Sequence, residues 1–246
     1  MNRTCIIVPV YDHSNCLEWL VERLGQTSLH VFFINDGSSD VCSQLMRDLI
    51  ANQEDFTLIE RSRNRGKGAA VKIGLRAAHR DGFTHALQID ADGQHDLNDI
   101  PRLIEQSTAN PEAMISGMPS FKNIPRLRYF GRYLTHVWVW INTWSLDIKD
   151  SMCGFRIYPV AASYRIIESA HVGDRMEFDT EIMVRLHWAG VAIVPVPTSV
   201  SYPSDGISHF RGLHDNLLIS WGHTRMFFGM LKRSPVLLMR KIKGRG

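Results

Sequence analysis

The sequence lacks the features of a secreted, disulfide-rich or membrane-spanning protein. Its 246 residues include only four cysteines, and no two of them form a C-x-x-C pair (Cys5, Cys16, Cys42 and Cys153). Cysteines scattered in this way argue against a disulfide scaffold and are typical of reduced, mostly packing thiols in a cytoplasmic protein. No apolar run reaches the roughly 18 residues that a spanning helix needs, and we expect no signal peptide.

Charge is nearly balanced, and neither internal repeats nor low-complexity segments are present. A formal net charge of +3 gives no reason to expect a nucleic-acid partner. The apolar content of 44% and charged content of 22% are those of an ordinary globular protein. A chain of this length can bury a full core, as one large domain or two small ones.

The first 90 residues alternate between short β-branched runs and segments with helical spacing of apolar residues. Strands are predicted at 4–10, 29–34, 56–60 and 85–89, and helices at 15–24, 41–51 and from Gly66 to Ala78. This alternation predicts an α/β fold with a mostly parallel, Rossmann-like sheet covered by helices on both faces. Ligands of such sheets bind beyond the carboxyl ends of the strands.

The second half is less regular. Helices are predicted at 98–107, 160–169 and 177–188, and strands at 113–117, after Arg156 and at 192–202. Because Pro195 and Pro197 interrupt the last strand, we place it at a sheet edge. Residues 204–212 are predicted to form a loop.

An acidic pair, Asp90 and Asp92, follows the apolar run Leu87–Ile89. Residues i and i+2 of an extended chain project from the same face, so the two carboxylates can converge on one point. Hard oxygen ligands suit Mg²⁺ or Mn²⁺, which can in turn hold a diphosphate. A plain polar turn is the alternative. The predicted fold favours a site, because Tyr11–His13 and Asn35–Gly37 also follow strand ends.

The segment Gly66-Lys67-Gly68 is neither a P-loop nor a dinucleotide fingerprint. At a helix N-terminus, with Arg63 and Arg65 nearby, it can attract an anion. A turn with solvated charges explains the same residues, and the pattern does not decide between them.

Two segments combine aromatic or apolar residues with cations. Residues 126–144 are rich in arginine and aromatics, and residues 213–246 form an amphipathic, basic C-terminal segment after a domain at 1–212. Both patterns suit an anionic membrane surface or a lipid substrate. A core helix with a charged end, and an ordinary basic terminus, are the alternatives.

Five motifs resemble those of family 2 glycosyltransferases in order and spacing. They are Ile7-Val8-Pro9-Val10-Tyr11, Asn35-Asp36-Gly37-Ser38, Arg63 to Gly68, Asp90-Ala91-Asp92-Gly93-Gln94 and Phe178-Asp179-Thr180-Glu181. The chain resembles the branch that includes dolichyl-phosphate mannosyltransferases. The resemblance covers about residues 4–211 and implies a GT-A fold, a UDP- or GDP-linked sugar donor, Mg²⁺ or Mn²⁺, and inversion at the anomeric carbon.

The resemblance also implies roles for individual residues. Nucleotide-binding positions are matched by Pro9, Tyr11 and Asp36, and the metal and diphosphate set by Asp90, Asp92 and Gln94. The base of hydroxyl-glycosylating relatives is matched by Asp179. Further positive charge near the diphosphate is expected from Lys67, the Ser208-His209 region and Arg211. The implied acceptor is a lipid or polyprenyl phosphate, met by a peripheral protein at the inner membrane face.

Two departures from the family pattern concern the nucleotide pocket. Asn35 replaces the usual first aspartate of its motif, and Asp12-His13 replaces the common Asn-Glu. Two other functions are considered. A sugar-phosphate nucleotidyltransferase should carry a glycine-rich signature where Pro9-Val10-Tyr11 stands. A non-catalytic nucleotide- or lipid-binding module would have no need of the Asp pair and Asp179.

Overall fold

The fold is built on one seven-stranded sheet. The computed structural model describes residues 2–120, 126–200 and 212–242. The strands are β1 (Thr4–Val10), β2 (His30–Asn35), β3 (Phe56–Glu60), β4 (His85–Gln88), β5 (Met114–Ser120), β6 (Arg156–Pro159) and β7 (Ile193–Ser199). Their order across the sheet is β3-β2-β1-β4-β6-β5-β7. Every pairing is parallel except those of β6, which runs antiparallel to both β4 and β5.

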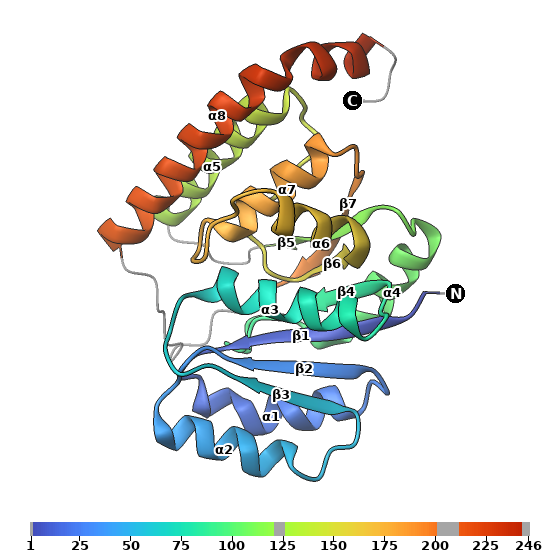
Figure 1. The fold of residues 1–246 in the computed structure, drawn as a ribbon, viewed down its shortest axis with the longest axis vertical. Coiled ribbons are helices and arrows are strands. Elements are labelled where there is room, and N and C mark those ends of the chain that lie inside the picture. Colours follow the sequence, from blue (N-terminus) through green and yellow to red (C-terminus); the bar gives the residue numbers. More distant parts are fainter. Residues whose placement is uncertain (1, 121–125, 201–211, 243–246) are drawn as a thin grey trace.

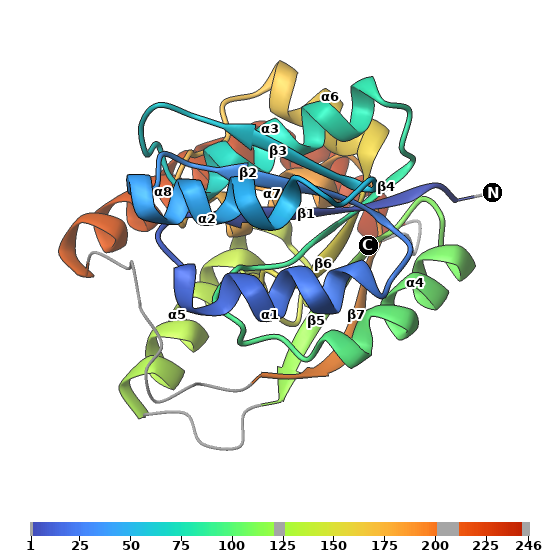
Figure 2. The ribbon, with the colours of Figure 1, turned by 90° about the horizontal axis from the view of Figure 1, so that it is seen from below.

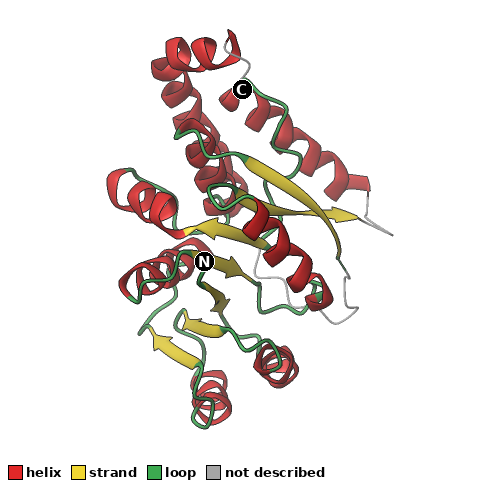
Figure 3. Cartoon of the chain, turned by 90° about the vertical axis from the view of Figure 1, so that its right-hand side faces the viewer, coloured by secondary structure: helices red, strands yellow, loops and turns green. Residues whose placement is uncertain are grey.

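Helices cover both faces of this sheet (Figure 3). They are α1 (Ser14–Gly25), α2 (Asp40–Ile50), α3 (Lys67–Arg80), α4 (Ile100–Ala109, preceded by a 3₁₀ turn at Leu97–Asp99), α5 (Arg126–Thr143), α6 (Val160–Ser169), α7 (Phe178–Trp188) and α8 (Gly212–Ile242). Alternate residues of β1 point to opposite faces. Ile6 and Val8 pack with α1, α2 and α4, whereas Cys5 and Ile7 pack with α3, α6 and α7.

The predicted α/β class and mostly parallel sheet are confirmed, and β7 is an edge strand as its prolines indicate. The antiparallel direction of β6 was not predicted. Four residues carry no signal of strand direction, and α6 begins at Val160, immediately after the strand ends at Pro159. The cysteines are free, and three of the four are buried, in line with packing thiols.

The parallel strands β2, β1 and β4 end at one edge of the sheet. In the register, Val10 of β1 pairs with Asn35 of β2, and Ile7 pairs with Gln88 of β4. The loops that follow these strands therefore meet at this edge, on the left of Figure 1. Asp12 joins two of them, because its Oδ1 accepts hydrogen bonds from the backbone N–H and the hydroxyl of Ser39 at 2.8 and 2.7 Å.

The C-terminal helix α8 lies along α5, at the end of the molecule opposite β3 (Figure 1). Met226, Met230 and Leu237 of α8 are buried in the core that α5 and α7 share. Toward its C-terminal end α8 changes direction, and Pro235, a residue that kinks helices, lies inside it. Among the described helices, none combines the length and the apolar character needed to cross a membrane.

Candidate active site

One lysine ammonium holds two carboxylates together at the polar edge of the sheet. Lys67 Nζ lies 2.8 Å from Asp90 Oδ2 and 2.7 Å from Asp179 Oδ2. The three residues come from the first position of α3, the loop that follows β4 and the first turn of α7. The Lys67 side chain is 16% exposed, so its reading as a solvated turn charge is wrong.

Close backbone packing fixes the start of α3. A Cβ added at Gly68 would lie 2.4 Å from Phe178 Cβ, and one at Gly66 would lie 2.6 Å from the Asp174 carbonyl oxygen. Gly66 also has φ of +112°, which L side chains rarely adopt. The backbone N–H of Ala69 donates to the Asp174 carbonyl at 2.8 Å. The motif glycines therefore let α3 approach the start of α7, and this contact places Lys67 between the two acids.

Further polar groups surround Asp90. Gln88 Nε2 donates to Asp90 Oδ1 at 3.1 Å, and the Tyr158 hydroxyl donates to Gln88 Oε1 at 2.8 Å. His95 Nε2 lies 3.5 Å from Asp90 Oδ2, with its ring stacked on Phe155. Both oxygens of this carboxylate thus face groups of the protein itself.

Asp179 is held by a buried arginine as well as by the lysine. Arg156 Nη1 donates to the Asp179 backbone carbonyl at 2.7 Å and lies 3.9 Å from its Oδ1. The guanidinium, which has no exposed surface, also binds the Cys153 carbonyl through Nε at 2.8 Å. Two carboxylates and two cations therefore share this part of the site.

Asp92 and Gln94 lie in the loop after β4. Asp92 Oδ1 accepts a hydrogen bond from the Gln94 backbone N–H at 3.1 Å. Within the described residues, no hydrogen bond or ion pair reaches Asp92 Oδ2. Gln94 borders a cavity of about 460 Å³ that Trp19 and Arg23 of α1 also line. Asp92 and Gln94 thus both carry side-chain oxygens in this loop, and Gln94 borders open space.

The predicted nucleotide-binding residues lie at the same edge. Asp36, 2% exposed, accepts hydrogen bonds from the backbone N–H groups of Arg65 and Gly66 and pairs with Arg61 at 3.2 Å. Asn35, 1% exposed, uses its amide to bind Ser43 and Glu60 and its oxygen to accept from the Ser38 N–H. Both side chains fasten the loop after β2.

Four other residues were predicted to belong to the site. Pro9 is buried within β1 and Tyr11 is half-buried directly after it. His209 and Arg211, with the rest of the predicted loop up to residue 211, lie outside the described residues.

Burial and charge shift the titration of these groups in opposite directions. Burial alone would raise the pKa of Asp90, but the Lys67 ammonium and His95 outweigh it and hold that pKa well below its usual value. Burial alone would lower the pKa of Lys67, yet its two carboxylates raise it above the ordinary value. Burial raises the pKa of Asp36, against its backbone hydrogen bonds.

The family of this chain is identified by a match to a family model. The model of glycosyl transferase family 2 matches residues 5–164. The chain belongs to this family. It is therefore a glycosyltransferase, and the resemblance seen in its motifs is confirmed.

Relatives in the family include enzymes named for lipid-phosphate substrates. The chain is 25% identical over 226 residues to polyprenol monophosphomannose synthase of Mycolicibacterium smegmatis, covering 85% of this chain and 82% of that protein. It is 27% identical over 215 residues to a dolichyl-phosphate beta-glucosyltransferase of Dictyostelium discoideum, covering 78% of this chain and 64% of that protein. The chain thus spans less than two thirds of the Dictyostelium enzyme.

Solved structures share the fold. Glucosyl-3-phosphoglycerate synthase of Mycobacterium tuberculosis, in complex with Mn²⁺, UDP and phosphoglyceric acid, superposes with a TM-score of 0.67 at 13% identity, covering 93% of this chain and 78% of that chain. A mannosyltransferase of Pyrobaculum calidifontis, in complex with GDP-Man and Mn²⁺, gives 0.61 at 18% identity, covering 94% and 64%. The predicted GT-A architecture is confirmed.

Proposed function

We propose that the protein transfers a sugar, with inversion, from a UDP- or GDP-linked donor to a lipid phosphate of the polyprenyl type, with Mg²⁺ or Mn²⁺ as cofactor. The observation that carries the proposal is the pairing of Asp90 and Asp179 through Lys67. This pairing brings the predicted donor-side and acceptor-side carboxylates to one place. The names of the relatives support the acceptor class, and the ligands of the structural neighbours support the donor and the metal.

The residues at the end of β4 fit a divalent cation of the hard type. Asp92 offers a carboxylate and Gln94 an amide oxygen, both suited to Mg²⁺ or Mn²⁺. Among the described residues, no group of three or more His, Cys, Asp or Glu side chains is arranged to hold a metal. Asp90, Asp92 and Gln94 would therefore share the cation with oxygens of the donor diphosphate. A cation bound there supplies Lewis-acid charge neutralisation at the leaving diphosphate.

The chain's own groups account for the remaining steps. In the transfer, an acceptor oxygen forms a bond to the anomeric carbon while the bond to the diphosphate oxygen breaks, and the electron pair leaves with the nucleoside diphosphate. Lys67 adds positive charge beside that leaving group. Asp179 would take the proton of a hydroxyl acceptor. A phosphate acceptor is already anionic and needs little help from a base, so toward it Asp179 would orient the incoming group or only structure the site. We propose that His209 and Arg211 supply further positive charge to the diphosphate.

Donor binding tests this function directly. We expect a UDP- or GDP-sugar at about 100 times its Kd, with Mn²⁺, to stabilise the protein by roughly 2.7 kcal/mol. For a chain of this size this raises Tm by roughly 5–10 °C. The same donor should then glycosylate a polyprenyl phosphate, and a chelator should stop the reaction. Consumption of a nucleoside triphosphate with a sugar phosphate would instead identify a nucleotidyltransferase. Donor binding with neither hydrolysis nor transfer, with or without the metal, would identify a non-catalytic module.

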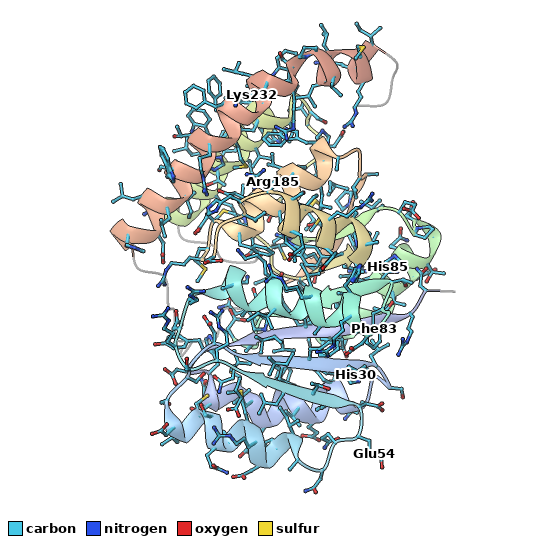
Figure 4. All side chains as sticks on the ribbon, in the orientation of Figure 1. His30, Glu54, Phe83, His85, Arg185 and Lys232 are labelled. Atoms are coloured by element: carbon cyan, nitrogen blue, oxygen red, sulfur yellow. The ribbon has the colours of Figure 1, made fainter. Side chains whose placement is uncertain are left out.

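The outer surfaces of α5 and α8 suit a membrane. Exposed apolar side chains lie on both helices: Tyr133, Leu134, Trp138 and Ile141 on α5, and Leu217, Trp221, Phe228, Leu231, Leu238, Met239 and Ile242 on α8. Lys232 is exposed among them, on α8, at the end of the molecule opposite Glu54 (Figure 4). Apolar side chains interspersed with cations favour an anionic lipid surface. We therefore propose peripheral attachment at the inner, cytoplasmic face of the membrane.

Substitution on this face tests the attachment. We expect Trp221→Ser, Phe228→Ser and Leu231→Ser, combined, to weaken partition onto anionic phospholipid vesicles at least about tenfold, because partition scales with the buried apolar area. Val41→Ser removes an exposed apolar residue from α2 and should leave partition unchanged. Truncation would be a poorer test, since Leu237 is buried. Equal partition of both variants, measured by vesicle sedimentation, would refute membrane attachment through α8.

A further inference from the structure

The bridge made by Lys67 places one cation where two different reaction partners are proposed to bind. Its ammonium contacts Asp90, on the donor side, and Asp179, on the acceptor side, at almost equal distances of 2.8 and 2.7 Å. Asp90 cannot retain this contact unchanged while it also serves a divalent cation, because the two positive charges repel each other and compete for the same carboxylate.

The lysine is the mobile partner in this arrangement. Asp90 is confined, because a Cβ at Gly154 would lie 2.2 Å from its Oδ2 and Gln88 binds its Oδ1. Asp179 is anchored through its backbone carbonyl by Arg156. Lys67 joins the site only through the end of a flexible four-carbon stem with three rotatable donors. Any rearrangement on ligand binding therefore falls to the Lys67 ammonium.

We propose that Lys67 neutralises Asp90 and Asp179 together in the donor-free protein and exchanges Asp90 for the donor's diphosphate when donor and cation bind. This inference rests on the proposed function for the identity of the anion. The exchange leaves Asp90 to the cation.

Mn²⁺ binding without any nucleotide separates this role from a purely structural one. In Lys67→Met the carboxylate of Asp90 loses its competing cation. We expect Mn²⁺ alone to bind this variant about tenfold more tightly than it binds the wild type. A tenfold change is the size of effect expected from one opposite charge close to a carboxylate. Binding is measured by the electron paramagnetic resonance signal of the free ion. The same variant should bind UDP or GDP with Mn²⁺ about tenfold more weakly, because the diphosphate loses the ammonium. Lys67→Arg keeps the charge, so it should show neither the tighter binding of Mn²⁺ alone nor the full loss of nucleotide affinity.

For a second variant we predict a change in Mn²⁺ affinity of the opposite sign. In Asp179→Asn the ammonium keeps Asp90 as its one charged partner among the described residues, so Mn²⁺ alone should bind several-fold more weakly than to the wild type. This variant keeps the test decisive if Lys67→Met does not fold, which circular dichroism and a melting curve would reveal. Unchanged or weakened Mn²⁺ binding in folded Lys67→Met, or unchanged binding in Asp179→Asn, would overturn the exchange. Failure of the wild type to bind any nucleotide sugar would instead overturn the proposed function, since the Mn²⁺ comparison needs no donor.

Discussion

Replacement of Asp92 by asparagine is expected to abolish sugar transfer while the protein remains folded. The substitution keeps an oxygen that can accept from the Gln94 N–H, so the turn after β4 retains its hydrogen bond. It removes the negative charge that we propose holds the cation against the donor diphosphate. Loss of a group that stabilises charge developing in the transition state commonly costs 10²–10³ in rate, and loss of the cation itself costs more, so we expect a decrease of at least about 10³-fold. This corresponds to roughly 4 kcal/mol in the barrier.

The measurement is turnover with the donor and lipid phosphate at saturating Mn²⁺, beside a melting curve. Asp96→Asn provides a matched control, four residues further along the same loop. Asp96 Oδ1 accepts a hydrogen bond from the Asn98 N–H at 3.0 Å, which asparagine can also accept. This control should retain turnover close to that of the wild type. Near wild-type turnover of Asp92→Asn under the same conditions would refute the assignment of Asp92 to the metal site.

Much of the fold could be predicted because its signals are local. The β-branched run 4–10 and the spacing of Leu17, Leu20, Val21 and Leu24 identify β1 and α1, and the structure buries all of these residues except the half-buried Thr4. The direction of β6 depends instead on how the chain returns from α5, which no short pattern records. The placement of loops 11–13 and 35–37 at one edge followed from parallel topology alone.

The candidate site was predictable in part. Asp90 and Asp179 stand out because each belongs to a motif. The ion pairs between them and Lys67 join residues 23 and 112 positions apart, a relation that spacing cannot reveal. Arg156 was missed as a functional residue because it reads as an ordinary strand residue. The sequence did contain a signal for Arg156, namely a charged residue in a short and otherwise apolar strand. A charge in such a strand is buried only when it is paired, which points to a partner in the protein.

The attachment of α8 to α7 leads to the second large effect. Arg225 Nη2 of α8 lies 2.5 Å from Glu181 Oε1 of α7, and the Glu181 side chain is 1% exposed. Gly222 faces the same carboxylate, since a Cβ there would lie 2.7 Å from Oε1. Glu181 is two residues after Asp179. The proposed membrane-facing helix is thus joined by a buried charge to the helix that carries the acceptor-side acid.

Arg225→Met is expected to destabilise the protein by about 3 kcal/mol, because it leaves the Glu181 charge buried with its closest cation removed. For a chain of this length the corresponding fall in Tm is roughly 6–12 °C. Lys232→Met, an exposed position on the same helix, should change Tm little. Equal melting of the two variants would show that the Glu181 pair contributes nothing to stability.

The shape of the melting transition also tests the domain boundary predicted at residue 212. A single transition whose Tm is lowered by Arg225→Met would show that α8 and α7 unfold as one cooperative unit. Loss of vesicle binding in a separate, earlier transition would show that residues 213–246 unfold as an independent segment.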